Sequence, residues 1–428
     1  SHVGYDLLDA TGSRRITEVV PWLAVVVATN VVLSGALAST VVCWAIILHY
    51  ATSSMYYFKG VNDVDGADLA DLPKRPGECP PAFPNAWYQL MYSDELKAGE
   101  AKSLQFLDQR LVAFRSNDGK RTVSVLDSYC THMGANLGKG GTVEGSCITC
   151  PFHGWKFEGE TGKCVGISYS ANANIPKAAA VRKWPCREDN GSIYVFYHVT
   201  GAAPTWEVPH SDAMSGGASW HGRSEHHVAA HIQDIPENGA DIAHLFYLHP
   251  KLVVEWVGWV FHISHRWKTC WIPNKEEKHR AYCKLQHEVV LFKRWHIPFS
   301  TVVVNVHMIG PALVHIHFDS PLGRLYAMQA ITPMEEQLQR CRHDIWASWT
   351  VPRFIAKLAL RSIIVQFERD VRMWNHKTHQ HKPMLVQGDG KIMQFRRWMT
   401  QFYSKESYEK GRGNPRNDVP NPNLLSDW

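Results

Sequence analysis

Two short stretches of the chain place cysteine beside histidine at spacings that suit a metal. Cys130 and His132 form a Cys-x-His pair, and Cys150 and His153 form a Cys-x2-His pair after seventeen intervening residues. Two cysteines and two histidines could hold a structural zinc ion or a [2Fe–2S] cluster with both histidines on one iron. Each pair begins a glycine-bearing loop, which favours the cluster, whereas Cys147 makes a Cys-x2-Cys pair with Cys150 that keeps zinc open.

A second group of candidate metal ligands lies in NGADIAHLFYLHP, residues 238–250. A non-haem Fe(II) oxygenase site needs two histidines, one carboxylate and open positions, and His244 and His249 could be the histidines. On an ideal helix they would point about 140° apart, since each residue turns by about 100°, so the helix must distort or end between them. Asp241 precedes His244 by one turn and is expected to accept its second ring N–H.

The elements that would position these residues fall into an all-β part and an α+β part. Short alternating apolar runs, separated by Asn-Asp-Gly, Gly-Lys-Gly-Gly and Asn-Gly turns, predict a small all-β domain over residues 85–200. Further strand-like runs precede a long stretch with apolar residues at helical spacing and no proline, residues 353–377, which predicts a helix. This order indicates an α+β domain with an antiparallel sheet over residues 201–428.

The N-terminal region contains a long stretch without charge. Residues 19–50 include no Asp, Glu, Lys or Arg, and as a helix they would span about 45 Å against a hydrocarbon core of roughly 30 Å. The stretch is too long for a signal peptide and unusually free of charge for a buried helix. It predicts one tilted transmembrane anchor, preceded by a short N-terminal segment (residues 1–18) and followed by an Asp-, Pro- and Gly-rich linker (residues 51–84).

Composition disfavours several kinds of partner. The net charge of +5 over 428 residues is mild and forms no dense basic stripe, so nucleic acid is not an expected partner. The ten cysteines are irregularly spaced, unlike those of a disulfide-stapled secreted domain. A Gly-x-Gly-x-x-Gly nucleotide-binding unit is not found, so electrons from NAD(P)H would come through a separate reductase.

The Cys-x-His…Cys-Pro-Phe-His-Gly-Trp pattern closely resembles the ligand loops of Rieske proteins. The resemblance implies that the two cysteine–histidine pairs bind a [2Fe–2S] cluster. Rieske proteins of respiratory complexes have a further cysteine in each loop, and the matching positions here are Ala135 and Phe152. The loops therefore look like those of Rieske oxygenases, and Cys147 is expected to be a buried free thiol beside the cluster.

The pattern Asn-x-x-Asp-x-x-His-x4-His is similar to the mononuclear iron motif of Rieske oxygenases. This resemblance implies that His244 and His249 are iron ligands and that Asp241 is the bridge through which electrons reach the iron. Asn238 matches a nearby position of the same motif. Electron transfer from the cluster to this second site would make the chain an oxygenase.

The third iron ligand of that family is an acid on a late helix. The sequence FERD at residues 367–370 offers Asp370, with Glu368 as the alternative. Two further histidine-rich stretches, HGRSEHH (221–227) and NHKTHQHK (375–382), are expected at the surface or behind the ligands.

Over nearly the whole chain the sequence resembles the animal cholesterol 7-desaturase (Neverland) group. The resemblance includes the apolar N-terminal segment, PPAFPNAWYQL, CPFHGWKFEGETGKCVGI, ENGADIAHLFYLH and VRMWNHK. It implies a transmembrane helix, an all-β Rieske domain and a helix-grip-like catalytic domain, which together remove hydrogens from C7 and C8 of cholesterol using O2. The alternatives are a Rieske-type sterol or steroid hydroxylase with another site of attack, and a Rieske electron-transfer protein.

The resemblance also implies partners. Rieske oxygenases commonly form head-to-tail homotrimers, in which the cluster of one subunit faces the iron of the next, and they take electrons from a ferredoxin- or flavin-type reductase. The anchor and the source of reductant suggest the endoplasmic reticulum membrane, with the catalytic domains facing the cytosol. Residues expected to line a sterol pocket are Val302, Val304, Val314, Trp346 and Trp349.

Overall fold

The computed structural model describes Trp44 and residues 53–65, 79–170, 175–241, 243–249, 261–292, 294–297 and 300–412. Apart from Trp44, the predicted anchor at 19–50 lies outside the described residues, as do residues 1–18 and the tail from 413. Among the residues that the structure describes, none of the helices has both the length and the apolar character that crossing a bilayer requires.

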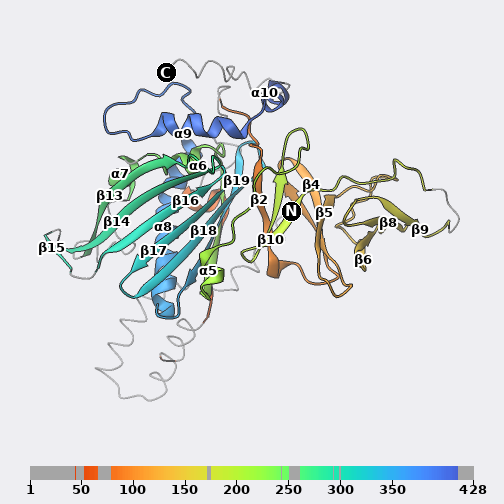
Figure 1. Ribbon diagram of the computed structural model, residues 1–428, viewed down its shortest axis with the longest axis horizontal. Helices are drawn as coiled ribbons and strands as arrows, with labels where there is room; N and C mark the ends of the chain where they lie inside the picture. The colour runs from red at the N-terminus through yellow and green to blue at the C-terminus, as the bar shows by residue number, and fades with distance from the viewer. Residues whose placement is uncertain are drawn as a thin grey trace.

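The first folded part is built from short antiparallel strands with one short 3-10 helix, which agrees with the predicted all-β domain (Figure 1). The Asn190–Gly191 turn joins two of them with φ of +50° and +70°, the left-handed pair that a tight hairpin needs. One sheet pairs β10 (Cys186–Asp189), β11 (Ser192–Tyr197) and β2 (Ala86–Tyr92), and a second pairs β3 (Ala101–Phe106), β4 (Gln109–Arg115) and β5 (Val123–Asp127). The third pairs β6 (Thr142–Glu144), β7 (Cys147–Thr149), β8 (Trp155–Glu158) and β9 (Cys164–Ile167).

The second part is a large, almost entirely antiparallel sheet in the order β1-β12-β19-β18-β17-β16-β14-β13, with β15 paired to β14. The strand-like runs predicted four of its nine strands, β14, β16, β17 and β18, and the predicted α+β architecture is confirmed. Its strands are β12 (Ser219–Val228), β13 (Phe261–Pro273), β14 (Arg280–Leu291), β15 (Trp295–His296), β16 (Val302–Ile309), β17 (Leu313–Ser320), β18 (Gly323–Glu335) and β19 (Leu338–Ala347).

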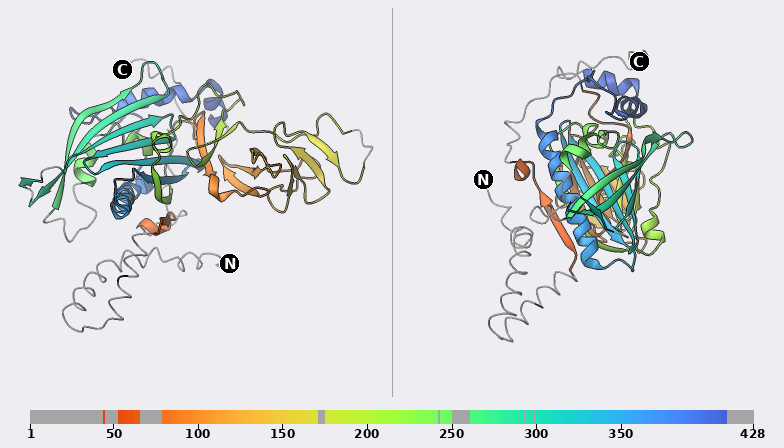
Figure 2. Two further views of the ribbon diagram at one scale, coloured as in Figure 1. Left: turned by 60° about the horizontal axis from the view of Figure 1, so that its bottom comes forward. Right: turned by 90° about the vertical axis from the view of Figure 1, so that its left-hand side faces the viewer.

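One long helix, α8 (Arg353–His376), packs against β12 and β19 of this sheet (Figures 1 and 2). Ala356, Leu360, Ile364 and Val371 are fully buried at its i, i+4 positions, which is the apolar stripe that the sequence predicted. The shorter helices are α4 (Asn62–Asp65), η1 (Ser93–Glu95), α5 (Asp212–Ser215), α6 (Asp234–Glu237), α7 (Ala243–Leu248), α9 (Ile392–Met399), η3 (Thr400–Phe402) and α10 (Lys405–Arg412).

Part of the predicted linker at 51–84 is a strand of the catalytic sheet. β1 (Met55–Lys59) pairs in parallel with β12, from Met55 opposite Gly222 to Lys59 opposite His226. Its burial alternates along MYYFK, and Tyr57 turns inward to α8. The linker prediction was therefore wrong at these residues: a five-residue strand is too short to stand out in a sequence rich in turn formers, and its partner lies far along the chain.

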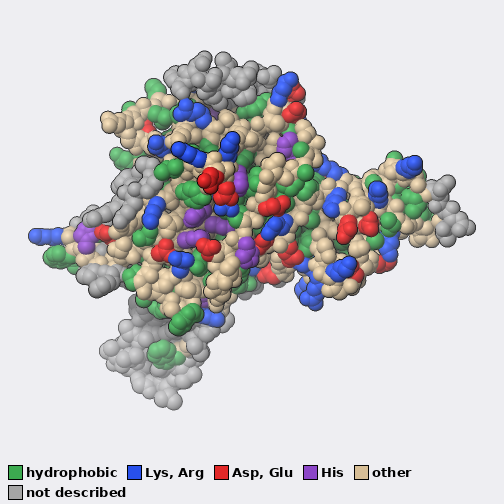
Figure 3. All heavy atoms as spheres, in the orientation of Figure 1, with side chains coloured by type: hydrophobic (Ala, Val, Ile, Leu, Met, Phe, Trp, Pro, Cys, Tyr) green, Lys and Arg blue, Asp and Glu red, His purple; other side chains and the backbone are tan. Residues whose placement is uncertain are grey.

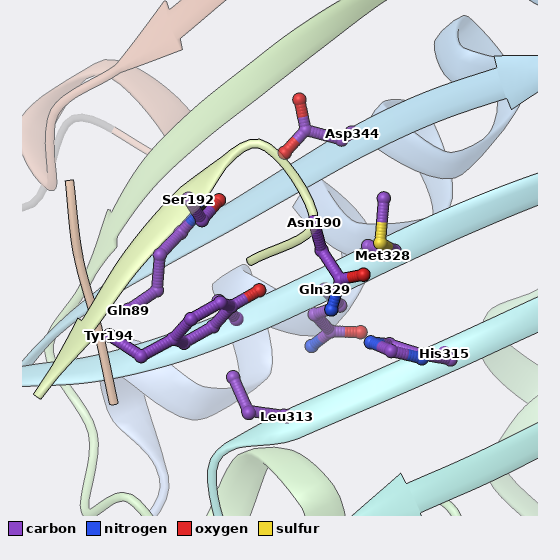
Figure 4. A pocket seen from close by; sticks show the side chains of 10 residues that line it. Gln89, Asn190, Ser192, Tyr194, Leu313, His315, Met328, Gln329 and Asp344 are labelled. Atoms are coloured by element: carbon purple, nitrogen blue, oxygen red, sulfur yellow. Dashed lines mark hydrogen bonds between the residues drawn. The ribbon is translucent and has the colours of Figure 1, made fainter. Parts of the chain in front are cut away.

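The two parts share one hydrophobic core cluster and are also joined by buried hydrogen bonds. Thr332 Oγ1 donates to the carbonyl of Gln89 at 2.7 Å, and a guanidinium N–H of Arg340 donates to the carbonyl of Leu90 at 2.7 Å. Figure 4 shows the small cavity enclosed there, of about 10 Å³, which Gln89, Ser192, Tyr194, His315 and Asp344 help to line. That volume suits about one water molecule, so the interface is close-packed and the two parts are held in one orientation.

Candidate metal centres

The structure brings His244, His249 and Asp370 together. The nearest ligand atoms of the three side chains all lie within 4.8 Å of one another. In the part of the chain that the structure describes, these two histidines and one aspartate form a group that could hold a metal ion. Two imidazoles and one carboxylate are the donor set of the facial triad that binds non-haem Fe(II), so the residues predicted far apart in the sequence form one candidate site.

The hydrogen bonds of His249 show that a metal fits this site. Nδ1 of His249 lies 2.6 Å from Oε1 of Gln366, and Nε2 lies 3.1 Å from Oδ1 of Asp370. An amide oxygen only accepts, so Nδ1 carries the proton. The lone pair of Nε2 then faces the carboxylate of Asp370, and the two repel each other unless a proton or a metal ion lies between them.

A hydrogen bond to Nδ1 also orients the ring of His244. It lies in α7 (Ala243–Leu248), and its Nδ1 is 2.5 Å from the main-chain oxygen of Asp241, so Nε2 is left for the metal. α7 ends at Leu248, one residue before His249, whose backbone N–H still donates to the carbonyl of Leu245 at 3.2 Å. The rings of His244 and His249 lie 5.3 Å apart and nearly perpendicular. Burial lowers the pKa of His244, which favours the neutral imidazole that a metal requires.

The carboxylate of Asp241 differs from expectation. The sequence predicted that it would accept the second ring N–H of His244, but the main-chain carbonyl takes that bond and Oδ2 lies 4.0 Å from Nδ1. Oδ1 instead accepts the backbone N–H groups of Ala243 and His244 at 3.0 and 3.3 Å, as a helix N-cap does. With about 29% of its side chain exposed, Asp241 is open to a partner. Asn238 caps the end of α6 and is half-buried.

The choice between the two acids of α8 follows from helix geometry. Glu368 and Asp370 are two residues apart, about 200° around the helix axis, so they face opposite ways. Asp370 faces His249, whereas Glu368 accepts a hydrogen bond from Tyr57 of β1 and lies 3.5 Å from Nε2 of His226. Burial acts to raise the pKa of Glu368, but its bonds to His226 and Tyr57 hold that pKa below the ordinary value. Glu368 therefore ties β1 to the helix, and Asp370 is the acid placed to act as a third ligand beside the two histidines.

A buried ion pair supports the segment before the histidines. Nε and Nη2 of Arg396 in α9 donate to the carboxylate of Glu237 in α6, at 2.7 and 3.0 Å. The carbonyl of Glu237 accepts the backbone N–H of Asp241 at 3.2 Å, and Lys391 donates to the carbonyl of Ala240 at 3.0 Å. The pair thereby fixes the turn between α6 and α7, from which Asp241 and His244 project.

The sequence interpretation missed several of these supporting residues. Gln366 could have been found, because it precedes Asp370 by one helical turn. Within the histidine-rich stretch at 221–227, His221 and His226 are buried rather than at the surface, and His226 lies behind the ligands beside Glu368. The sequence around Glu237 gives no indication of its ion pair, because its partner Arg396 lies 159 residues away.

The loops of the β domain have one repeated geometry. In each loop the cysteine N–H donates to the carbonyl five residues later, and its carbonyl accepts from a glycine four residues later, at distances between 2.8 and 3.0 Å. The cysteines are Cys130 and Cys150, and the glycines Gly134 and Gly154 have φ of +74° and +66°. Because this conformation favours glycine, the glycine in each loop gives the two ligand pairs matching shapes.

The side chains of these loops fit a [2Fe–2S] cluster. Cys130 and Cys150 are buried free thiols, and burial, together with the neighbouring Cys150, raises the pKa of Cys130 to about 11. The rings of His132 and His153 lie 4.8 Å apart, and Nδ1 of His153 is buried without a hydrogen-bond partner in the described structure. Thiols that form no disulfide and an imidazole nitrogen without a hydrogen-bond partner are groups that a metal cluster would bind. The ring of Trp155 stacks on His132 with centroids 4.6 Å apart.

The Cys147–Cys150 spacing that kept zinc open does not make a chelating pair in the structure. Cys147 lies on β7 (Cys147–Thr149), and three residues of extended chain place its Cα about 10 Å from that of Cys150. Residues at that spacing point to opposite faces of a strand, so the two thiols are not a chelating pair. Cys147 is free, as predicted, but half-buried rather than buried.

The residues predicted to line a sterol pocket differ in their exposure to solvent. Val304 and Val314 are buried. The strand that pairs with each of them carries side chains that pack under α8 or α9. Trp349 is 89% exposed, so its assignment to a pocket was wrong. Trp346 pairs with Trp220 across β19 and β12 and lies beside the turn at Gly191 of the β domain.

Comparisons with known proteins agree with this geometry. Residues 86–185 match the Rieske [2Fe-2S] domain, and residues 195–403 match the 3-ketosteroid 9alpha-hydroxylase C-terminal domain. The chain is 41% identical over 361 residues to cholesterol 7-desaturase nvd of Xenopus laevis, covering 82% of this chain and 78% of that protein. It is 40% identical over 353 residues to cholesterol 7-desaturase of Caenorhabditis elegans, covering 78% and 80%.

Solved structures share the fold at low sequence identity. NdmA of Pseudomonas putida CBB5 with caffeine matches with a TM-score of 0.57 at 15% identity, covering 76% of this chain and 91% of that one. Dicamba monooxygenase bound to dicamba matches with a TM-score of 0.55 at 16% identity, covering 76% and 98%. With the ligand loops, the metal triad and the curated relatives in agreement, the chain belongs to the cholesterol 7-desaturase family of Rieske oxygenases.

Proposed function

We propose that this protein removes the hydrogens from C7 and C8 of cholesterol, giving 7-dehydrocholesterol, with O2 and with electrons from NAD(P)H through a separate reductase. The observation behind the proposal is the assembled triad of His244, His249 and Asp370 in a chain about 40% identical to cholesterol 7-desaturases. When bound, the Rieske cluster supplies electrons and the mononuclear iron supplies activation of dioxygen.

The protein's own residues hold and orient the two centres. Gln366 and the main chain of Asp241 fix the histidine rings with their Nε2 atoms inward. The side chains of His249 and Asp370 are 5% and 11% exposed, so they stand largely out of contact with water. A dry, pre-arranged site lets binding energy position the sterol C–H bonds.

Electron transfer is proposed to cross between subunits. The cluster loops and the triad lie at opposite ends of the long axis of the molecule (Figure 1), so one chain does not bring its own two centres together. A head-to-tail homotrimer would set His132 or His153 of one subunit beside Asp241 of the next. The exposed carboxylate of Asp241 and the partly exposed imidazoles of the loops are open to such a contact.

The proposed location is the endoplasmic reticulum membrane, with residues 19–50 as the anchor and the catalytic domains in the cytosol. The charge-free stretch of the sequence and the poorly soluble substrate support this arrangement. Cytosolic exposure would give the cluster access to reductases.

Product analysis tests the proposal. The full chain is expressed with a reductase in cells that lack the activity, supplied with labelled cholesterol, and compared with His244→Ala and Asp370→Ala. We expect a 7,8-desaturated sterol that both variants lose while the Rieske absorption stays. Glu368→Gln is the matched control, since Glu368 is on the same helix but faces Tyr57 and His226, and it should keep the mononuclear iron.

A second candidate function is hydroxylation of a steroid. It is favoured by the match of residues 195–403 to the 3-ketosteroid 9alpha-hydroxylase C-terminal domain and by 26% identity over 350 residues to the oxygenase component of 3-ketosteroid-9-alpha-monooxygenase of Rhodococcus rhodochrous. A hydroxylated product with no new double bond would favour this function and refute the desaturase. No product from either substrate, with both centres loaded and reduced, would refute both.

A further inference from the structure

The imidazole of His132 is held differently from the two imidazoles of the mononuclear site. His244 and His249 each have a ring nitrogen bound to an oxygen of the protein, which is the usual way in which a metal-binding histidine is oriented. In the part of the chain that the structure describes, the ring of His132 makes no such hydrogen bond. It contacts the rings of His153 and Trp155 instead, with centroids 4.8 and 4.6 Å away.

The indole of Trp155 lies flat against this imidazole, with an angle of 9° between the ring planes. Trp155 begins β8 and packs against the apolar cluster that contains Cys130 and Cys150. Its carbonyl also accepts the backbone N–H of Cys150 at 2.8 Å, so its main chain is tied to the second ligand loop. An indole stacked in this way covers one face of the imidazole, keeps water from that face and limits the rotation of the ring.

Tyr169 holds the indole from its other edge. The indole N–H of Trp155 donates to the hydroxyl of Tyr169 at 3.0 Å. Tyr169 lies in the turn that follows β9, whose last residue, Ile167, pairs with Trp155. Because the side chain of Tyr169 is 62% exposed, it buries little apolar area. The bond to the indole is therefore its main contribution to this site.

The turn after β9 fits closely against the ligand loops. Oγ of Ser168 donates to the carbonyl of His153 at 3.2 Å, and a Cβ built on Gly154 would lie only 2.3 Å from that Oγ. A residue larger than glycine would push the turn away. β8 and β9 lie side by side at the far end of the β domain (Figure 1), where hydrophobic side chains reach the surface (Figure 3).

We propose that Trp155, held by Tyr169, is a positioning residue for the Rieske cluster, fixing the plane of the His132 imidazole and shielding one of its faces from water. Reduction adds one negative charge to the cluster, and nearby water stabilises that charge, so solvent exposure is one of the factors that set the reduction potential. The stack therefore keeps the potential below the value that a fully hydrated imidazole would give. The inference goes beyond the proposed function, because it concerns the cluster alone and holds whichever reaction the mononuclear centre performs.

The reduction potential of the cluster tests the proposal without turnover. Tyr169→Phe, Trp155→Phe and the double variant are made in the full chain, loaded with iron, and titrated with redox mediators while the Rieske absorption is followed. At the midpoint potential of the native protein, we expect the ratio of reduced to oxidised cluster to be several-fold higher in Tyr169→Phe. Phenylalanine at position 155 has no N–H, so Tyr169→Phe should have no further effect in the Trp155→Phe background.

A second tyrosine of the same domain supplies the matched control. Tyr129 is 52% exposed and directly precedes Cys130, but its hydroxyl makes no hydrogen bond among the described residues. Tyr129→Phe should keep the native potential. Pulsed electron paramagnetic resonance of the reduced cluster gives an independent readout, because the hyperfine couplings of the histidine nitrogens depend on ring orientation. These couplings should change in Tyr169→Phe and stay native in Tyr129→Phe.

Each outcome decides the question. A higher potential and altered couplings, confined to the variants that lose the bond between Tyr169 and Trp155, support the proposal. A potential in Tyr169→Phe that is unchanged or lower overturns it, as does a shift that persists undiminished in the Trp155→Phe background. An equal shift in Tyr129→Phe overturns it too, because the loss of any hydroxyl near the loops would then act alike. Loss of the Rieske absorption in Tyr169→Phe would show that the bond serves folding only, and would also overturn it.

Discussion

The bond from His249 to Gln366 is the most direct test of how the protein builds its mononuclear metal site. Gln366→Leu keeps the size of the side chain but removes the oxygen that accepts the Nδ1 proton at 2.6 Å. A buried donor left without a partner costs about 1–3 kcal/mol. Loss of such a supporting bond typically lowers metal affinity about 10–100-fold, which is about 1.4–2.8 kcal/mol. The two routes agree, so we expect a drop in Fe(II) affinity of that size.

The Rieske cluster serves as an internal reference for this experiment. A graded series of Fe(II) chelator concentrations is applied to native and variant protein, and iron per chain is measured together with the Rieske absorption. We expect the mononuclear iron of Gln366→Leu to leave at about 10–100-fold lower chelator concentration while the Rieske absorption is unchanged. Gln366→Glu is the matched control, because its carboxylate still accepts from Nδ1, and it should hold iron at least as well as the native protein.

Two results would refute this reasoning. If Gln366→Leu retains iron as tightly as the native protein while His249→Ala loses it, the hydrogen bond does not support the ligand. If the Rieske absorption falls in parallel with the mononuclear iron, the substitution has damaged the fold and the loss does not report on His249.

Three further outcomes are expected. Burial raises the pKa of Asp344 from 3.8 to about 6, so the stability that its neutral form contributes is fully present below about pH 4 and is lost as the pH rises through 6. The difference of two pKa units corresponds to roughly 3 kcal/mol of unfolding free energy. We therefore expect the melting temperature of Asp344→Asn minus that of the native protein to rise between pH 5 and pH 7. A difference that stays constant across that range would refute it. Glu237→Gln should lower turnover and mononuclear iron together, because it breaks the pair with Arg396 that fixes the turn before His244, and normal iron with normal turnover would contradict this role. Asp241→Ala should retain both metal centres and reduce product formation by an order of magnitude or more if electrons enter there, whereas normal turnover of this variant would exclude Asp241 from the path.

The parts of the site that could be predicted from the sequence are those set by short-range spacing. Cys130, His132, Cys150 and His153 lie in two loops of fixed shape, and His244 and His249 lie within one turn of helix and its end. Asp370 could be placed on a helix by its apolar periodicity, but choosing it over Glu368 required knowing which face of α8 meets His249. Sequence spacing shows that the two acids face apart, and only the packed structure shows which side the metal is on.

The parts that could not be predicted depend on contacts between distant segments. Tyr57 and Glu368 are 311 residues apart, and β1 has no pattern strong enough to distinguish it from a linker. The role of Asp241 also changed, because main-chain geometry at the start of α7 decided which oxygen meets His244. Trp349 was expected to line a pocket, and its 89% exposure contradicts that expectation.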